Sequence, residues 1–181
     1  MHPSSINLSY RKGVAAIGYK HMNTSHDKHF MQRCIELSQL SIDNGDAPFG
    51  SLITKDGKLV AEGINAANTK ISEHAEIIAL HNAHQVLGTS DLSECTLYTS
   101  CEPCPMCSFM IREYKIKRVV FALPSLYMGG YSKWQILQDP DLSKFKLFFG
   151  SPPEVTGGFM EDEAKQIMKG TIFSMFGKDA K

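Results

Sequence analysis

The sequence predicts an α/β layered fold built on a mixed β-sheet, and three observations support this prediction. The chain has 181 residues, of which 43% are hydrophobic and 21% charged, so it can form one domain with a full core. The pair Asp56-Gly57 stands between two short apolar runs, which is the strongest local signal of a β-hairpin. After this hairpin, predicted strands and helices alternate, as they do in sheets covered by helices.

The individual elements follow from apolar periodicity and from residues that start or stop helices. Residues 1–23 show neither helical nor strand periodicity, and we expect a flexible N-terminal arm ahead of a single domain over 24–181. A first helix is predicted from Ser25 as N-cap to the stop signal Asn44-Gly45. The remaining predictions are strands over 49–53 and 59–64, a helix over 73–87 that stops at Gly88, a strand over 96–99, a helix over 106–114, strands over 118–123 and 144–149, and a closing helix over 161–176.

Charge and composition exclude several classes of protein. Lys and Arg number 19, as do Asp and Glu, so the chain has no overall bias towards nucleic acid or an anionic membrane. No apolar run approaches the roughly 20 residues that cross a bilayer, and the run Val14–Ile17 is too short for a secretory signal. Adjacent Cys-x-x-Cys spacings without an export signal favour metal or redox chemistry over disulfides. We therefore expect a cytoplasmic protein with no membrane partner.

Three cysteines at every third position make the segment 100–107 the most informative motif. Pro105 suits the first position of a helix, which makes Cys104 the predicted N-cap and places Cys107 one turn in. Two thiolates at a helix N-terminus converge, and the helix dipole favours their ionised form. The nearest suitable imidazole is His74, at the start of the preceding helix. We predict one zinc ion per chain, bound by His74, Cys104 and Cys107.

Three protein ligands leave the fourth zinc position to water, which distinguishes a catalytic site from a structural one. Glu76, two residues after His74, is expected beside that position, where its carboxylate takes a proton from water and passes it on. In the alternative, Cys101 completes a closed structural site; we disfavour it because Cys101 ends a strand. The other cysteines and histidines are interpreted as core or surface residues, namely Cys34, Cys95, His26, His29, His81 and His84.

The motif His74-Ala75-Glu76, together with Pro103 to Cys107, resembles the zinc site of the cytidine-deaminase-like superfamily. The similarity extends from about Asp46 to Leu123 and is closest to the guanine deaminase and tRNA adenosine deaminase branches. The resemblance implies a three-layer α/β/α sandwich with a central five-stranded mixed sheet and one zinc ion. It also implies hydrolytic release of ammonia from an amino-substituted nucleobase or nucleoside, and a homodimer.

The resemblance also implies four substrate contacts. Asn65 matches an asparagine that hydrogen-bonds the base, and an amide suits this because it both donates and accepts. Phe49 matches a residue that packs against the ring, and the backbone of Ala75 and Ser100 supplies further contacts. The less favoured alternatives are that Asn65 is a turn residue at a strand end and that Phe49 is a core residue.

The substrate prediction is guanine, because Pro48-Phe49-Gly50 and Cys101-Glu102 look more like guanine deaminases than tRNA deaminases. The balanced charge agrees, since tRNA requires several cations that face phosphate. The alternatives are a tRNA adenosine deaminase, a cytosine deaminase and a non-catalytic zinc-binding module. One basic cluster is explained equally by a solvated helix end and by an RNA contact; it comprises Arg112, Lys115, Lys117 and Arg118.

The C-terminal part departs from the guanine deaminases. Glu113 stands where they place an aromatic residue, and Asp139 and Asp141 are candidates for their acidic substrate-reading residue. Three aromatic residues are interpreted as a lid over the base, or alternatively as interface or core residues, namely Tyr127, Tyr131 and Trp134.

Overall fold

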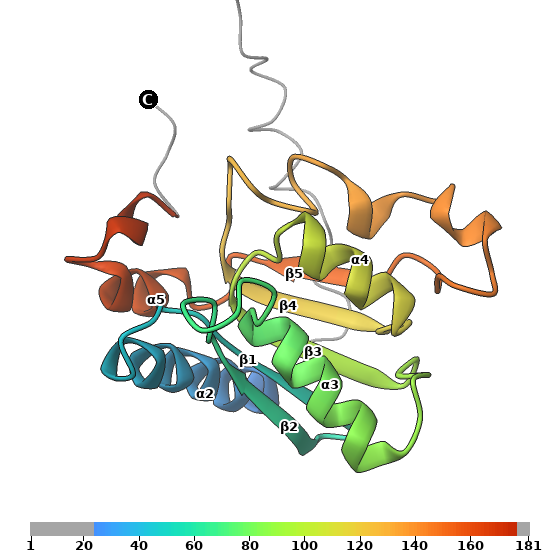
Figure 1. Ribbon diagram of the computed structural model, residues 1–181, viewed down its shortest axis with the longest axis horizontal. Coiled ribbons are helices and arrows are strands. Elements are labelled where there is room, and N and C mark those ends of the chain that lie inside the picture. Colours follow the sequence, from blue (N-terminus) through green and yellow to red (C-terminus); the bar gives the residue numbers. More distant parts are fainter. Residues whose placement is uncertain (1–23, 177–181) are drawn as a thin grey trace, which may run out of the picture.

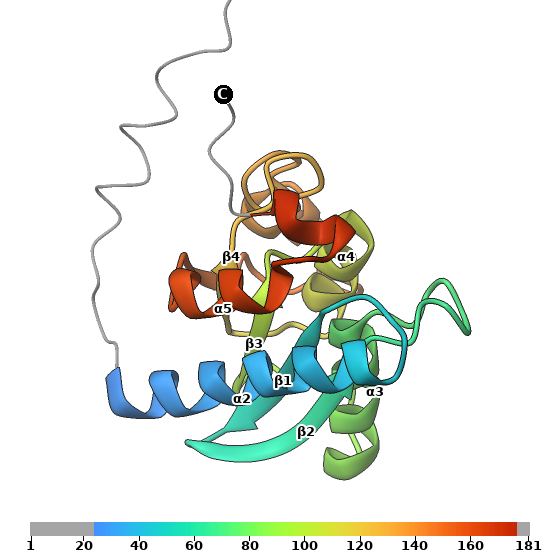
Figure 2. The same ribbon diagram turned by 90° about the vertical axis from the view of Figure 1, so that its left-hand side faces the viewer.

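The computed structural model describes residues 24–176, which form a five-stranded sheet between two layers of helices (Figure 1). Helices α3 (Ala75–Leu87) and α4 (Pro105–Glu113) cover one face, and α2 (Thr24–Asp43) and α5 (Glu161–Met168) cover the other (Figure 2). The three-layer prediction is therefore confirmed. The predicted arm, residues 1–23, lies outside the described residues. Within the described part, no helix combines the length and apolar composition needed to cross a membrane.

The sheet is mixed, as predicted, with the strand order β2-β1-β3-β4-β5. Strand β1 pairs antiparallel with β2 and β3, whereas β3, β4 and β5 run parallel. Asp56 and Gly57 form the hairpin turn with φ angles of 51° and 71°, the left-handed values that an Asp-Gly pair tolerates. The strands are β1 (Gly50–Lys55), β2 (Lys58–Ile64), β3 (Cys95–Cys101), β4 (Arg118–Leu123) and β5 (Glu154–Gly157).

Side chains of the central strands alternate between two hydrophobic cores. Leu97 of β3 and Val119 of β4 pack in the core under α3 and α4, and their successors Tyr98 and Val120 pack in the core under α2 and α5. All four are buried. A sheet buried on both faces explains why β4 reads as a continuous apolar run. Cys95 and Cys34 also lie in these cores, one in each, as expected.

The prediction of a fifth strand over 144–149 is wrong, because that segment forms turns and the strand lies later, at β5. Phe145 and Leu147 are 62% and 91% exposed, so the apolar residues there do not pack on the sheet. The actual strand contains one large apolar residue, Val155, and is stabilised by parallel pairing with β4. The hydropathy of this segment therefore did not predict a strand.

The predicted closing helix over 161–176 is divided in two. Helix α5 ends at Met168, and Gly170 then takes a φ of +81°, which terminates the α-helix. Thr171 caps a separate 3₁₀ turn, Ile172–Met175, by accepting a hydrogen bond from the N–H of Phe173.

Gly63 of β2 allows the N-terminus of α3 to approach the sheet. A Cβ at this position would lie against the carbonyl oxygen of Ala75 and 2.7 Å from the nitrogen of Ala79. Both are helix backbone atoms, so the contact is relieved only by moving α3.

We expect Gly63→Ala to destabilise the protein by about 3 kcal/mol and to weaken zinc binding, since His74 is the N-cap of α3 and moves with the helix. Urea unfolding and zinc titration measure the two effects. Lys58→Ala, at the exposed start of the same strand, is the control and should change neither. Wild-type stability and zinc affinity in Gly63→Ala would contradict this account of the helix position.

Candidate active site

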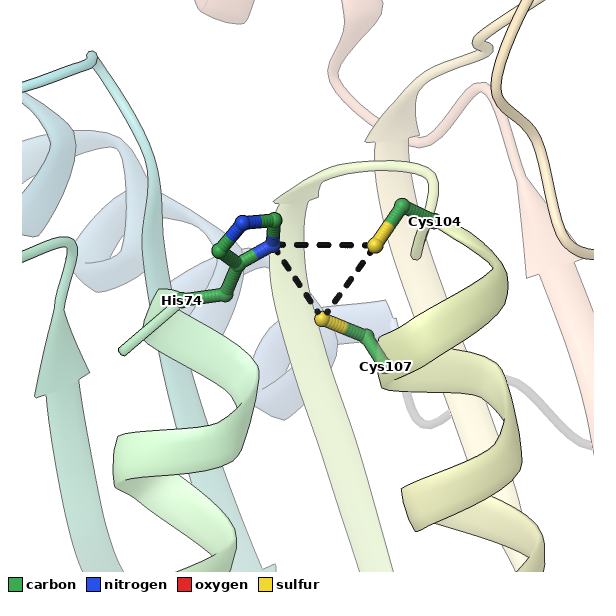
Figure 3. A group of neighbouring side chains, drawn as sticks. All are labelled: His74, Cys104 and Cys107. Atoms are coloured by element: carbon green, nitrogen blue, oxygen red, sulfur yellow. Dashed lines mark hydrogen bonds between the residues drawn. The ribbon is translucent and has the colours of Figure 1, made fainter. Parts of the chain in front are cut away.

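The three predicted metal-binding side chains converge at the N-termini of two neighbouring helices (Figure 3). His74 is the N-cap of α3, and Cys104 is the N-cap of α4, with Pro105 in the first turn. Cys107 lies one turn into α4 and is fully buried. Because both helices present the positive end of their dipoles here, an anionic sulfur is stabilised at this point.

The spacing of the three ligand atoms fits a tetrahedral zinc ion. The Sγ atoms of Cys104 and Cys107 are 3.7 Å apart, and they lie 3.6 and 3.5 Å from His74 Nδ1. Zn–S bonds of about 2.3 Å and a Zn–N bond of about 2.0 Å at tetrahedral angles give edges of roughly 3.8 Å and roughly 3.5 Å. The histidine and the two cysteines are thus positioned to bind one metal ion.

The electrostatics of this group favour a thiolate on Cys104. The hydrogen bond with Cys107 lowers the pKa of Cys104 to about 4 despite burial, and the contact with His74 contributes in the same direction. The same contact with Cys104 raises the pKa of the His74 imidazole. Since zinc binds the thiolate and not the thiol, Cys104 is prepared for a metal cation, whereas the neighbouring Cys104 and burial raise the pKa of Cys107 well above its usual value.

Glu76 lies in the first turn of α3 and is 6% exposed. Burial raises the pKa of its carboxyl to about 7, and the negative charge of Cys104 acts in the same direction. The interaction with the neighbouring Cys107 thiol acts in the opposite direction and lowers this pKa. Glu76 therefore contacts the ligand group without being one of the three converging residues. A carboxyl that titrates near neutral pH can both take and return a proton.

Cys101 lies apart from the three converging residues. It ends β3 and packs in the core under α2 and α5, on the face of the sheet opposite α4. Burial raises the pKa of its thiol well above the usual value. The four-ligand alternative therefore has no support in this geometry. The remaining histidines in the described chain are exposed, namely His26, His29, His81 and His84.

We expect Cys101→Ala to retain one zinc ion per chain and near-wild-type turnover, because the thiol is a core group. Cys107→Ala is the matched variant and should lose most of its zinc, since only two converging groups remain. Elemental analysis after dialysis measures the metal content of both. Loss of zinc from Cys101→Ala would restore the closed, structural site as the better interpretation.

The four predicted substrate contacts lie near the end of the sheet at which β1 begins and β2 and β3 finish. Asn65 follows β2, and its N–H donates to the carbonyl oxygen of Phe49, just before β1, at 3.1 Å. Ser100, near the end of β3, accepts at Oγ a 3.2 Å hydrogen bond from the N–H of Gly50. Ala75 is the buried first residue of α3, next to His74. The fold thus places the four residues around the ends of adjacent elements, and their contact with a base stays a prediction.

Phe49 packs against aromatic residues from the C-terminal segment. Its ring centroid lies 5.1 Å from that of Phe173 and 5.9 Å from that of Phe176, both edge-on. Phe49 is far in the sequence from Phe173 and Phe176, and the sequence pattern did not predict that they pack together. The 3₁₀ turn after Gly170 brings the two C-terminal rings to Phe49.

Sequence reasoning missed the role of Glu102, which is 3% exposed between Cys101 and Pro103. Its carboxylate accepts hydrogen bonds from the N–H groups of Ser125, Tyr131 and Ser132 at 2.8, 3.1 and 2.6 Å, and from the Ser132 hydroxyl at 3.0 Å. It thereby holds the segment 125–132 beside the metal-binding loop. The one available signal was an acidic residue directly after a buried strand.

Two of the four residues in the basic cluster predicted at the end of α4 are engaged inside the protein. Arg112 is 1% exposed and donates to the carbonyl oxygens of Ile136 and Asp139 at 2.7 and 2.8 Å, so it anchors the connecting loop. Arg118 pairs with the buried Asp27 at 2.7 Å. The two interpretations of the cluster, a solvated helix end and an RNA contact, therefore do not apply to these arginines, because the guanidinium group of each is bound within the protein.

The predicted lid aromatics have different environments. Tyr131 is half-buried, with its ring 6.4 Å from that of Phe121, whereas Tyr127 and Trp134 are more than half exposed. Asp139 and Asp141 are engaged locally: the Asp139 carboxylate accepts from the Asp141 N–H, and Asp141 pairs with Lys144. Glu113 is exposed at the end of α4.

Comparison with known proteins matches this chain to deaminases. The family model for the cytidine and deoxycytidylate deaminase zinc-binding region matches residues 24–123. Guanine deaminase of Bacillus subtilis (strain 168) is 43% identical over 96 residues, which cover 51% of this chain and 62% of that protein. The tRNA-specific adenosine deaminase of Aquifex aeolicus (strain VF5) is 30% identical over 148 residues, covering 80% of this chain and 98% of that protein. The X-ray structure of the B. subtilis guanine deaminase superposes with a TM-score of 0.53 at 40% identity, covering 57% and 66% of the two chains. The chain thus spans about three fifths of the length of the guanine deaminase relative.

Proposed function

This chain belongs to the cytidine and deoxycytidylate deaminase family, and on that premise we propose that it is a zinc-dependent hydrolase that deaminates a nucleobase, guanine above all. The observation that carries the proposal is the contact of buried Glu76 with a group of one histidine and two cysteines spaced for tetrahedral zinc. Three protein ligands fit the catalytic class of zinc sites. The clustered thiols must stay reduced to bind metal, which supports a cytoplasmic location.

The chain's own residues have distinct roles in this proposal. Zinc, when held by His74, Cys104 and Cys107, supplies a Lewis acid that makes water nucleophilic near neutral pH. Glu76 takes the proton of that water and returns it to the leaving nitrogen, so that a C–O bond replaces the C–N bond and ammonia departs. Asn65 orients the base through a hydrogen bond with its side-chain amide.

Phe49 covers one face of the base in this proposal, supported by the rings of Phe173 and Phe176 that pack against it. The backbone of Ala75 and Ser100 contributes further contacts. A base enclosed by aromatic side chains is oriented and kept from bulk water.

Guanine is favoured over tRNA adenosine by the charge distribution. Lys and Arg are balanced by Asp and Glu, and two of the four cations in the predicted basic cluster, Arg112 and Arg118, are occupied within the protein. A tRNA ligand needs several cations free to face its phosphates. The tRNA adenosine deaminase remains the second candidate because the A. aeolicus relative aligns over nearly its whole length.

An ammonia-release screen of the zinc-loaded protein tests the proposal. The substrates are guanine, adenine, cytosine and their nucleosides, with inosine formation in tRNA measured in parallel. We expect guanine to be the best substrate by at least tenfold. Inosine in tRNA whose formation falls steeply with salt would select the second candidate. Inertness toward every substrate would leave a non-catalytic zinc-binding module.

We also propose a homodimer, supported by large apolar side chains exposed on and beside α4. The ring of Phe109 lies 6.2 Å from that of Phe149, so α4 contacts the turn segment that precedes β5. Light scattering should give about twice the chain mass of 20.1 kDa, and Phe109→Glu should lower it. Val86→Glu, on the exposed side of α3, is the control and should not. The exposed large apolar residues of α4 and of the segment 145–148 are Met106, Phe109, Phe145, Leu147 and Phe148.

A further inference from the structure

The amide of Asn65 is held in one orientation by a carboxylate to which the sequence analysis assigned no role. Asn65 is 4% exposed, and its Nδ2 donates to Asp46 Oδ1 at 2.7 Å. Its Oδ1 is buried and has no hydrogen-bond partner among the described residues. An unpaired buried acceptor is unfavourable by about 1–3 kcal/mol, so it indicates a partner that the folded chain itself does not supply.

Asp46 is itself fixed by backbone hydrogen bonds. Its Oδ1 accepts from the N–H of Ala47 at 2.7 Å, and its Oδ2 accepts from the N–H of Asn68 at 2.8 Å. Partial burial raises the pKa of this carboxyl, but these bonds and the one from Asn65 outweigh burial and leave it below the usual value. Asp46 is therefore ionised at neutral pH and can only accept hydrogen bonds.

The charge on Asp46 decides which end of the Asn65 amide faces it. A carboxylate repels an amide oxygen and attracts an amide N–H, so the nitrogen must face Asp46 and the oxygen must face away. The backbone on either side connects this residue to the metal-binding group: the N–H of Ala66, which follows Asn65, donates at 2.9 Å to the carbonyl oxygen of Glu73, which immediately precedes His74.

We propose that Asp46 is a positioning residue for base recognition, which holds the Asn65 amide so that its Oδ1 is a fixed acceptor for an N–H of the base. This inference rests on the proposed function and adds a selection rule to it: the base must present a donor to Asn65. A base without that donor leaves Oδ1 buried and unpaired, and it is rejected for that reason.

The first test concerns the orientation and needs no turnover. The side-chain amide of Asn65, identified in ¹⁵N spectra by its loss in Asn65→Ala, should show slow hydrogen exchange in the wild type. In Asp46→Asn it should exchange at least tenfold faster. Asp43→Asn is the matched control: it removes the same charge from an exposed acid that contacts Gln39, and it should leave the Asn65 signals unchanged. Equal exchange in all three proteins would overturn the proposal.

The second test separates positioning from structural support by a double-mutant cycle. With guanine, Asp46→Asn should lower kcat/KM roughly 10- to 100-fold, mostly through KM, with zinc content unchanged. In the Asn65→Ala protein, the same substitution should lower kcat/KM by less than twofold, because Asp46 acts through Asn65. An equal loss in both backgrounds would show a merely structural role and overturn the proposal.

The acceptor itself is tested by guanine binding to the Glu76→Gln protein, in which the base is not consumed. When the Glu76→Gln protein is saturated with guanine, the ¹³Cγ resonance of Asn65 should move downfield, as expected when the amide oxygen accepts a hydrogen bond. Bound guanine with an unmoved resonance would overturn the proposal. If guanine does not bind at all, the proposed function fails instead, and the exchange measurement still decides whether Asp46 orients the amide.

Discussion

Glu76→Gln should bind zinc as the wild type does and lose about 10³-fold in kcat, within the range for removal of a general acid–base group. Zinc should remain because Glu76 is not one of the three converging residues. Turnover should fall because an amide of the same shape cannot take a proton from water or return it to the leaving nitrogen. Metal analysis and steady-state ammonia release on the same preparation measure both effects.

Glu73→Gln is the matched control for this variant. Glu73 directly precedes His74 and pairs with Lys70 at 3.4 Å on the protein surface, so its neutralisation should leave kcat within about twofold of wild type. A Glu76→Gln protein that keeps near-normal turnover would remove the proposed proton carrier. A variant that loses zinc as well would show that Glu76 supports the metal, and kcat would then say nothing about proton transfer.

The metal centre was predictable from sequence because its residues are determined by local geometry. Pro105 fixes the start of α4, and Cys104 and Cys107 then converge whatever the rest of the chain does. His74 required one further step, that two helix N-termini meet at the same end of a sheet, and this follows from strands alternating with helices. The fold class was predictable for the same reason.

The parts that could not be predicted depend on contacts between distant segments. Strand β5 has too few apolar residues to produce a pattern, and it forms because β4 offers a free edge. Arg112 resembles a surface cation in sequence, yet the loop after β4 folds over it and binds its guanidinium. Asp46 acquires its role only when the loop after β2 brings Asn65 and Asn68 to it.

Glu102→Ala should lower the free energy of unfolding by about 3–5 kcal/mol, because one side chain satisfies several donors of another segment. The N–H groups of Ser125, Tyr131 and Ser132 all lose their acceptor. Each buried donor left unpaired costs about 1–3 kcal/mol, and water offsets part of this for the half-buried members.

The same substitution should also lower kcat/KM, because the segment that Glu102 holds contacts the metal-binding loop. Within this segment, the N–H of Gly130 donates at 2.8 Å to the carbonyl oxygen of Pro103, the residue before Cys104. Urea unfolding and ammonia release measure the two effects. Glu102→Gln, which keeps one carbonyl oxygen, should show a smaller loss of stability, and Glu113→Ala, at an exposed acid on α4, should stay within about 0.5 kcal/mol of wild type. A loss below about 1 kcal/mol in Glu102→Ala would mean that the segment 125–132 is held by its other contacts. In that case the position of the metal-binding loop would not depend on this carboxylate.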